Sequence, residues 1–394
     1  MAIKAEKIRN DFEILKNQII YFDNACMSLK PKQIVDKINE YYNKYPACAG
    51  RSSHTLGKNL EHEILVARKK IANFLNAKKA NEIIFTRNTT ESINLVAKSF
   101  SLRKGDCVLI SDKEHNSNLV PWLLLKKNIG IKLKLFEFGN LNDFEKKLTK
   151  DVKIVSTVQT SNLDGTTQNV REMAKIAHEN GAKIVIDAAQ SAPHKEINVR
   201  KLDADFLACS GHKMLGPTGT GILYGKIKEL EKLSPFITGG DTVKNTTYDS
   251  FELDEIPARF EAGLQDYAGI VGFGAAIDYL KKIGMKNIER HEIMLNEIIT
   301  DGLKSKVQLI GPEDASERGG IFSFNINGIE PHEIALILNH SANIMIRSGM
   351  HCVHSWFNSH KIKGSARASL YLYNTEHEAR RFVDEVNKIV KMIG

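Results

Sequence analysis

Short apolar runs alternate with longer amphipathic stretches between residues 82 and 224. The runs are rich in Ile, Val and Leu, and they occupy residues 82–86, 105–111, 154–162, 183–187, 205–209 and 222–224. Runs of this length that are largely apolar are typical of strands buried on both faces, and the stretches between them are long enough for helices. The pattern predicts an α/β fold with a mostly parallel sheet that helices cover on both sides.

The flanking segments predict further helices and a second group of strands. Near the N-terminus we expect a helix over residues 1–20, a short strand over 19–24, a helix that begins at Pro31, a polar loop over 49–56 and a helix over 58–75. Toward the C-terminus we expect helices over 266–304, strands over 320–326 and 366–371, a helix that begins at Pro331 and a helix over 375–392. The C-terminal pattern predicts a compact α+β unit.

Two polar side chains follow neighbouring strand-like runs. Lys213 lies between the run at 205–209 and a glycine-rich turn, and Asp187 ends the run at 183–187. A lysine desolvated at such a place becomes a free amine that bonds to an aldehyde, and a carboxylate at the carboxyl end of a strand can face the ring nitrogen of pyridoxal phosphate. A solvated turn lysine and a capping carboxylate are the alternatives for either residue alone. Together with Gln190, the pair predicts pyridoxal 5′-phosphate as the cofactor.

The phosphate of that cofactor needs its own donors. Residues 88–91 have the form of a helix cap, and a helix N-terminus with free amides binds phosphate. Capping alone explains Asn88 and Glu91 but not two successive hydroxyls, so we predict Thr89 and Thr90 as phosphate contacts. Ser210 and His212, which flank the glycine before Lys213, are further candidates.

A cysteine and an arginine near the C-terminus are the other candidates for chemistry. Gly349 permits a sharp turn that presents Cys352 among Arg347 and two histidines, His351 and His354. The alternatives are a metal site formed by these histidines and Cys352, which lacks a second pair at zinc spacing, and a buried inert cysteine. Arg367 follows closely in the sequence, where its guanidinium can clamp a carboxylate; a surface arginine is the alternative.

The segments that carry this chemistry resemble, in order, those of the class V aminotransferase family. Within that family the chain resembles the cysteine desulfurases of the group that serves sulfur mobilisation for iron–sulfur clusters. The resemblance covers nearly the whole chain and rests on residues 21–25, 87–96, 114–115, 187–190, 210–213, 259–263 and 347–352.

The resemblance implies a fold and a division into domains. It implies the type I fold of pyridoxal-phosphate-dependent transferases, with a mostly parallel seven-stranded sheet in a large cofactor-binding domain over residues 20–265. A smaller α+β domain would comprise residues 1–19 and 266–394. A homodimer is implied as well.

The resemblance also implies a reaction and roles for residues. L-cysteine would be converted to L-alanine while Cys352 takes the sulfur as a persulfide for a sulfur-acceptor protein or an iron–sulfur scaffold. His115 would stack on the cofactor ring and pass protons, Asn162 would contact the ring oxygen and the substrate carboxylate, and Arg367 would bind that carboxylate. Gln190 would belong to the cofactor site, and no metal is implied.

The chain departs from the family pattern at three positions. Cys26 stands where a small apolar residue is usual, which leaves open a second thiol near the site or a small buried cysteine. Asp164 adds a carboxylate that could alter substrate choice, and Leu264 puts in doubt a phosphate contact across the dimer. Arg51 and His54, in the loop at 49–56, are weak substrate-side candidates.

Composition excludes several classes of function. The 394 residues are 42% apolar, yet no run approaches the length of a membrane span and the N-terminus lacks a signal-peptide pattern, so we expect a cytoplasmic protein. Five cysteines, an odd number, argue against a disulfide framework. The net charge of +8 is spread along predicted helices near acidic residues, which argues against direct nucleic-acid binding and leaves charge for an anionic ligand or an acidic protein partner.

Two other interpretations remain open at this point. The same cofactor could serve a selenocysteine lyase, a cystine lyase or an aminotransferase for a small substrate. A basic RNA- or metal-binding scaffold without catalysis is the third hypothesis.

Overall fold

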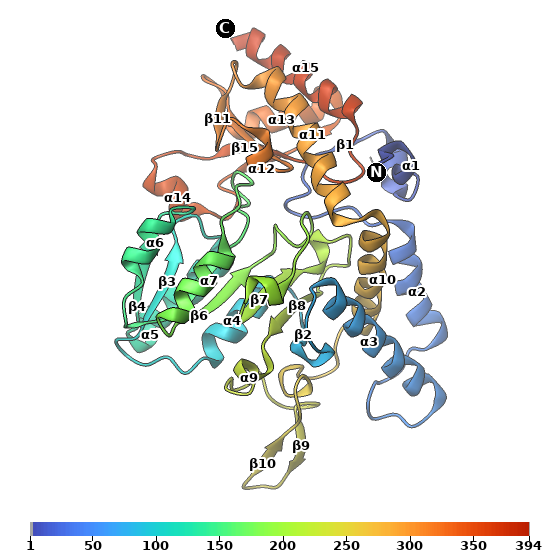
Figure 1. Ribbon diagram of the computed structural model, residues 1–394. Coiled ribbons are helices and arrows are strands. Elements are labelled where there is room, and N and C mark those ends of the chain that lie inside the picture. The colour runs from blue at the N-terminus through green and yellow to red at the C-terminus, as the bar shows by residue number, and fades with distance from the viewer. Residues whose placement is uncertain (1–2, 394) are drawn as a thin grey trace.

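The computed structural model describes residues 3–393, and a seven-stranded sheet lies at its centre (Figure 1). In spatial order the strands are β2 (Ile83–Thr86), β8 (Gly221–Gly225), β7 (Phe206–Ser210), β6 (Lys183–Asp187), β5 (Val152–Val158), β3 (Cys107–Ser111) and β4 (Lys132–Phe136). Strand β8 is antiparallel to both of its neighbours, and the pairs from β7 to β4 are parallel. The predicted mostly parallel sheet is confirmed.

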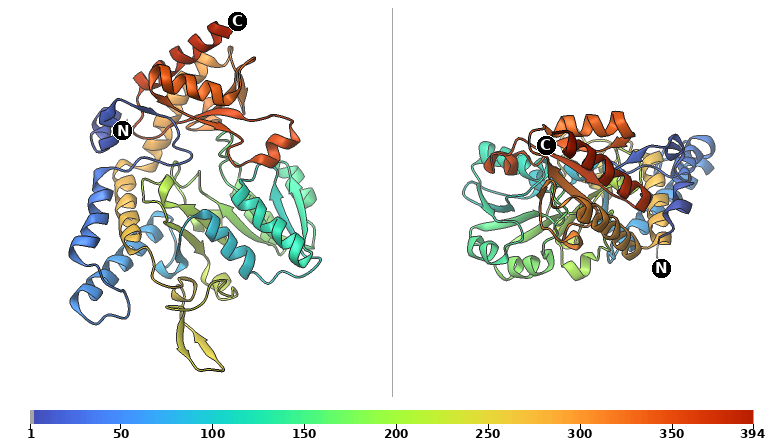
Figure 2. Two further views of the ribbon diagram at one scale, coloured as in Figure 1. Left: turned by 180° about the vertical axis from the view of Figure 1, so that it is seen from behind. Right: turned by 90° about the horizontal axis from the view of Figure 1, so that it is seen from above.

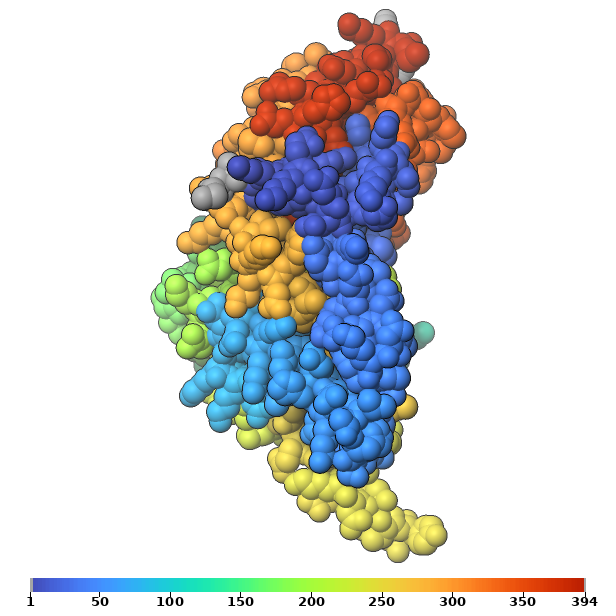
Figure 3. Space-filling model, turned by 90° about the vertical axis from the view of Figure 1, so that its right-hand side faces the viewer, coloured from blue at the N-terminus to red at the C-terminus, as the bar shows by residue number. Residues whose placement is uncertain are grey.

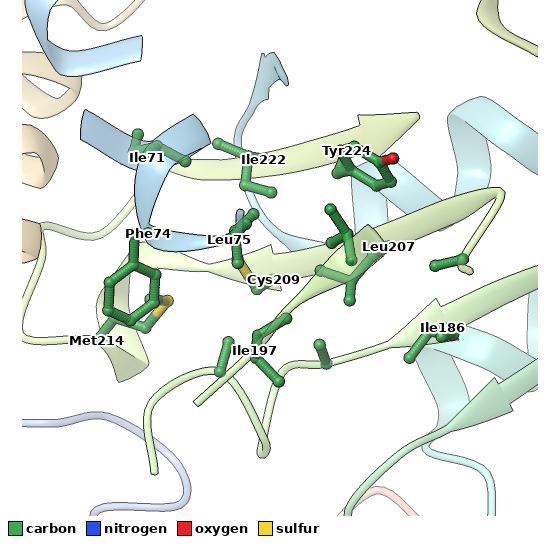
Figure 4. Close-up of a cluster of buried hydrophobic side chains, with 14 of the residues drawn as sticks. Ile71, Phe74, Leu75, Ile186, Ile197, Leu207, Cys209, Met214, Ile222 and Tyr224 are labelled. Carbon is green, nitrogen blue, oxygen red and sulfur yellow. The ribbon is translucent and has the colours of Figure 1, made fainter. Parts of the chain in front are cut away.

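Both faces of this sheet are buried, as the apolar runs predict. In β7, Leu207 and Cys209 face one core, whereas Phe206 and Ala208 face the other. Figure 4 shows part of the first core, where Ile222 lies beside Ile71 and Cys209 lies beside Leu75. Because successive side chains point to opposite faces, such a strand requires apolar residues at every position.

Helices cover both faces of the central sheet (Figure 2). Those between its strands are α4 (Thr89–Ser99), α5 (Asn116–Ile129), α6 (Leu141–Lys147), α7 (Val170–Glu179) and α8 (Val199–Leu202), and α9 (Ile227–Leu230) follows β8. Three longer helices, α2 (Lys32–Lys44), α3 (Thr55–Phe74) and α10 (Tyr267–Ile283), pack together at one side of the molecule, with α10 against both others.

A second, antiparallel sheet stands at the C-terminal end of the molecule (Figure 1). Its strands, in spatial order, are β11 (Gln308–Ile310), β12 (Ile321–Asn325), β15 (Ser365–Ser369) and β14 (Arg347–Gly349). The other elements of this region are α11 (Met285–Leu303), α12 (Ala315–Arg318), α13 (Pro331–Ala342), α14 (His354–Ser359), α15 (Glu376–Ile393) and β13 (Ile344–Met345), which pairs with β1 (Ile20–Tyr21). The buried core here includes Phe322, Phe324 and Phe382, so the predicted α+β unit is confirmed.

Two features of the fold differ from the sequence prediction. The single helix predicted over residues 1–20 is wrong for the described part, which forms α1 (Ala5–Arg9) and a separate 3₁₀ turn (Glu13–Asn17). Phe12 lies between them with an extended backbone, because its ring is fully buried against Tyr373 at a centroid distance of 4.6 Å. An unpredicted hairpin of β9 (Val243–Thr246) and β10 (Phe251–Leu253) projects from the far end of the molecule (Figure 3).

The predicted division into residues 20–265 and a unit of 1–19 with 266–394 stays a prediction. Phe12 and Leu15, from the N-terminal segment, and Phe273 and Ile277, from α10, share one apolar core with strands of the central sheet. The two predicted units are therefore joined by buried contacts. Among residues 3–393, no helix is both long and apolar enough to cross a bilayer.

Candidate functional site

One cavity gathers eleven of the residues that the sequence predicts for the site. It opens where β5, β6 and β7 end, and Val158, Asp187 and Ser210 border it. The predicted residues on its border are Thr89, Thr90, His115, Asn162, Asp187, Gln190, Ser210, His212, Lys213, Cys352 and Arg367. This location agrees with the general position of ligands at the carboxyl ends of strands in α/β sheets.

The turn that carries Lys213 is held by hydrogen bonds from the segment around Ser28. Strand β7 ends at Ser210, and a 3₁₀ turn (Gly211–Lys213) follows at once. The carbonyl of His212 accepts hydrogen bonds from the backbone N–H of Ser28 and from Nζ of Lys30, both at 3.0 Å. Burial lowers the pKa of the Lys213 amine, and the nearby Asp187 opposes that shift. The arrangement favours the neutral amine that bonding to an aldehyde requires.

The carboxylate of Asp187 lies at the end of β6 and is almost fully buried. Its Oδ1 accepts a hydrogen bond from the backbone N–H of Ala189 at 2.9 Å, and burial raises its pKa. The charge of Lys213 opposes that rise. A cationic ring nitrogen placed in the cavity would stabilise the ionised carboxylate further.

Hydroxyl groups cluster at the N-terminus of α4. Asn88 caps this helix by accepting from the N–H of Glu91 at 3.0 Å. Thr89 Oγ1 lies 2.7 Å from Ser210 Oγ, and Thr90 Oγ1 lies 2.7 Å from Ser117 Oγ. A helix N-terminus lined with hydroxyls suits a phosphate. Sequence reasoning missed Ser117, since only the packing of α5 beside α4 brings its hydroxyl to Thr90.

Three buried polar atoms of residues on the cavity border lack hydrogen-bond partners within the part of the chain that the structure describes. They are Oε1 of Gln190, Nδ1 of His351 and Nε of Arg367. Buried polar groups are rarely left unpaired, so a polar ligand is the natural partner for them. Pyridoxal phosphate fits this border, because the hydroxyl cluster, Asp187 and Lys213 supply counterparts for its phosphate, ring nitrogen and aldehyde.

His115 is held as a neutral imidazole. Its Nδ1 accepts a hydrogen bond from the backbone N–H of Ser117 at 3.1 Å, so it caps α5. Burial and the charge of Lys213 lower its pKa to about 3. The preceding residue, Glu114, is buried and accepts from the N–H of Val158 at 3.0 Å, which ties the start of α5 to β5. The stacking role of His115 stays a prediction.

The turn that presents Cys352 is held by groups from the central sheet region. His351 and Cys352 both have left-handed backbones, with φ values of 47° and 59°. The backbone N–H of Asn116 donates to the Cys352 carbonyl, and Nδ2 of Asn162 donates to the His351 carbonyl, each at 2.7 Å. Cys352 is exposed, so the alternative of a buried inert cysteine is wrong. These contacts hold the thiol at the mouth of the cavity.

The metal interpretation of this turn finds no support in the geometry. Nε2 of His351 lies 2.8 Å from Ser365 Oγ, and Nδ1 of His354 lies 2.9 Å from Asn116 Nδ2. Within residues 3–393, no three His, Cys, Asp or Glu side chains gather as a metal ion would require.

Arg367 is buried in β15, with 3% of its side chain exposed, so the alternative of a surface arginine is wrong. Its Nη1 donates to the Asn162 carbonyl at 2.7 Å. Its Nη2 lies 3.7 Å from Asp23 Oδ1. Arg347 pairs with it directly across the β14–β15 ladder, so two guanidinium groups reach the same side of the cavity. Such a pair suits an anionic substrate group.

Several weaker candidates lie elsewhere. Asp164 does not border the cavity, since it is buried in an ion pair with Lys113 at 2.7 Å. Arg51 pairs with Asp241 at 2.7 Å, and His54 caps α3. Leu264 is 72% exposed. Of the departures from the family pattern, Cys26 alone borders the cavity.

We expect Gly165→Ala to destabilise the fold beyond the ordinary cost of a left-handed alanine. Gly165 has φ of 78°, and an added Cβ would lie 1.9 Å from the carbonyl oxygen of Arg318. Gly181 has the same φ and open space around it, so Gly181→Ala is a matched control. The control should cost about 1–2 kcal/mol of unfolding free energy, and overlap should add roughly 1–3 kcal/mol for Gly165→Ala. Equal losses in urea unfolding would contradict this expectation.

We expect three buried histidines to reduce the stability of the cofactor-free protein as the pH falls below about 6.5. Burial lowers the pKa of His115 to about 3, of His212 to about 4 and of His351 to about 2. Below pH 6.5 these histidines bind protons in the unfolded chain but stay neutral in the folded chain. Each one therefore lowers the free energy of unfolding by up to about 1.4 kcal/mol per pH unit. Urea unfolding at pH 7 and 5.5 measures the loss, and His351→Gln should reduce it. An unchanged pH dependence in that variant would contradict the assignment.

The chain has relatives of known classification. Residues 20–382 match the family model described as aminotransferase class-V. A probable cysteine desulfurase of Pyrococcus abyssi is 40% identical over 397 residues, which cover 98% of each chain.

Solved structures agree with this likeness. The apo cysteine desulfurase of Thermococcus onnurineus NA1 has a TM-score of 0.96 and 41% identity, with 100% of this chain and 99% of that chain covered. A cysteine desulfurase of Escherichia coli has a TM-score of 0.92 and 29% identity, with 100% of both chains covered.

Proposed function

Since the chain belongs to the aminotransferase class-V family, we propose that it is a cysteine desulfurase, which converts L-cysteine to L-alanine and takes the sulfur onto Cys352. One observation carries the proposal. A single cavity is bordered by an amine, a carboxylate, a buried guanidinium and an exposed thiol from distant segments of the chain: Lys213, Asp187, Arg367 and Cys352.

Pyridoxal phosphate supplies this site with an aldehyde that bonds to amines and with a ring that accepts electrons. We assign the phosphate to Thr89, Thr90, Ser210 and His212, and the ring nitrogen to Asp187. His115 would stack on the ring, and Asn162 and Gln190 would contact its polar groups. The unpartnered Oε1 of Gln190 and the hydroxyl cluster at α4 support these assignments.

Lys213 carries protons in this proposal. Burial lowers the pKa of its amine, so Nζ can take a proton from the substrate carbon and later return it. Its turn is fixed through the His212 carbonyl, which holds the backbone that carries the Lys213 side chain.

Arg367 and Cys352 act on the two ends of the substrate. The guanidinium of Arg367 binds the carboxylate, because it borders the cavity and its Nε has no hydrogen-bond partner among residues 3–393. The thiolate of Cys352 attacks the substrate sulfur. The carbon–sulfur bond breaks with its electron pair on the carbon side, and a persulfide remains on Cys352.

The protein's partners follow from exposed features. The exposure of Cys352 leaves its persulfide open to a sulfur-acceptor protein or an iron–sulfur scaffold. Tyr248 and Phe251, in the hairpin, and Leu264 are exposed apolar side chains, which supports a homodimer. The five free thiols support a reducing compartment, the cytoplasm.

A substrate comparison tests the proposal. The purified protein, reconstituted with pyridoxal phosphate, is given L-cysteine, L-selenocysteine or L-cystine, and alanine is quantified. We expect alanine from L-cysteine together with sulfane sulfur bound to the enzyme. Alanine from selenocysteine alone, or pyruvate from cystine, would refute the proposal in favour of a lyase.

A further inference from the structure

Two of the five cysteines border the same cavity, although they lie more than 300 residues apart in sequence. Cys352 lies in the turn after β14, and Cys26 lies in a turn shortly after β1. Cys107 and Cys209 are buried in strands, and Cys48 does not border this cavity. Cys26 is therefore the cysteine that the fold places beside Cys352 at the site.

Cys26 does not behave as a buried core residue. It is partly exposed, and it belongs to none of the apolar clusters among the described residues. Its sulfur accepts a hydrogen bond from Nη1 of Arg347 at 3.1 Å. The small buried cysteine considered from the sequence is therefore wrong.

The surroundings of Cys26 suit an anionic sulfur. Arg347 and Arg367 face each other across β14 and β15, and Nη atoms of both lie 3.7 Å from the carboxylate of Asp23. Two cations thus face one carboxylate, and Nε of the buried Arg367 has no hydrogen-bond partner among the described residues. Guanidinium groups form strong, charge-assisted hydrogen bonds to anions.

We propose that Cys26 is a second sulfur-carrying residue, which exchanges sulfane sulfur with the persulfide of Cys352; this rests on the proposed desulfurase function. The Cys26 thiolate attacks the outer sulfur of that persulfide. A new sulfur–sulfur bond forms on Cys26, the old bond to Cys352 Sγ breaks, and Cys352 leaves as a thiolate. The proton on the outer sulfur stays with it, and no oxidant or reductant is consumed.

The exchange gives the sulfur two environments. On Cys352 it is exposed and available to an acceptor, but also to small thiols in solution. On Cys26 it is partly sheltered, beside the guanidinium of Arg347. Cys26 therefore serves as a store from which sulfur returns to Cys352 when an acceptor docks.

Peptide mass spectrometry after a single turnover tests the exchange. The holoenzyme receives one equivalent of L-cysteine per site, alkylation quenches the reaction, and trypsin releases each thiol on its own peptide. These peptides span residues 17–32 for Cys26, 348–361 for Cys352 and 45–51 for Cys48. Cys48 has the same partial exposure and is the matched control.

We expect the added sulfur on Cys352 first and then on Cys26, at a level at least about tenfold above that on Cys48. In Cys352→Ser no sulfur should reach Cys26, and in Cys26→Ser it should stay on Cys352. Sulfur on Cys352 but never on Cys26, or equal labelling of Cys48, would overturn the exchange and leave the desulfurase function intact. Sulfur on Cys26 in Cys352→Ser would overturn the order of transfer. Absence of both alanine and any persulfide would refute the desulfurase function itself.

Discussion

Replacement of Lys213 with alanine is expected to lower the rate of alanine formation from L-cysteine by roughly 10²- to 10⁴-fold or more. Lys213 is the amine that the fold places at the end of β7 on the cavity border, and burial lowers its pKa. Without it, no group at that position can bond to the cofactor aldehyde or return a proton to the substrate carbon. Steady-state alanine assays of the reconstituted variant measure the loss.

The covalent attachment gives a second readout for the same variant. Borohydride reduction of the wild type should leave a pyridoxyl group on the peptide that contains Lys213, and the variant should lack it. Lys153→Ala is a suitable control, since Lys153 is exposed on β5 and does not border the cavity. A pyridoxyl group on another lysine of the wild type would contradict the assignment.

Replacement of Cys352 with serine is expected to lower alanine formation at least about 100-fold while the cofactor still binds. The thiol is the acceptor that allows the carbon–sulfur bond to break without the loss of a free thiolate. The turn that holds it depends on the backbone carbonyls of His351 and Cys352, so serine should leave the turn intact. Alanine assays and mass spectrometry of the persulfide measure the two effects.

The control for this variant is Cys48→Ser, which alters a thiol outside the cavity and should leave alanine formation unchanged. Undiminished alanine formation in Cys352→Ser would mean that the sulfur leaves by another route. The enzyme would then be a lyase of the same family.

Much of the central fold was predictable because its signals are local. A strand buried on both faces is apolar along its length, and Phe206 to Cys209 of β7 follow this rule. Polar residues at or just after the carboxyl ends of neighbouring parallel strands lie on the same side of the sheet. Asp187 and Lys213 could therefore be placed in one site.

The remaining features depend on contacts between distant segments. The burial of Phe12 against Tyr373 interrupts a segment whose own pattern favours a helix. The ion pair with Lys113 removes Asp164 from the site, although its sequence position suggests a role there. The pairing of Arg347 with Arg367 follows from strand register, which single-sequence patterns do not specify.

The turn that carries Cys352 also depends on contacts between distant segments of the chain. The preceding strand, β14, belongs to the C-terminal sheet, yet the carbonyls of His351 and Cys352 in the turn accept hydrogen bonds from Asn162 and Asn116, which follow strands of the central sheet. The turn thus links the C-terminal sheet to the central sheet region. Loss of these two hydrogen bonds would release the turn from the cavity, so the position of the Cys352 thiol depends on contacts between the two sheet regions.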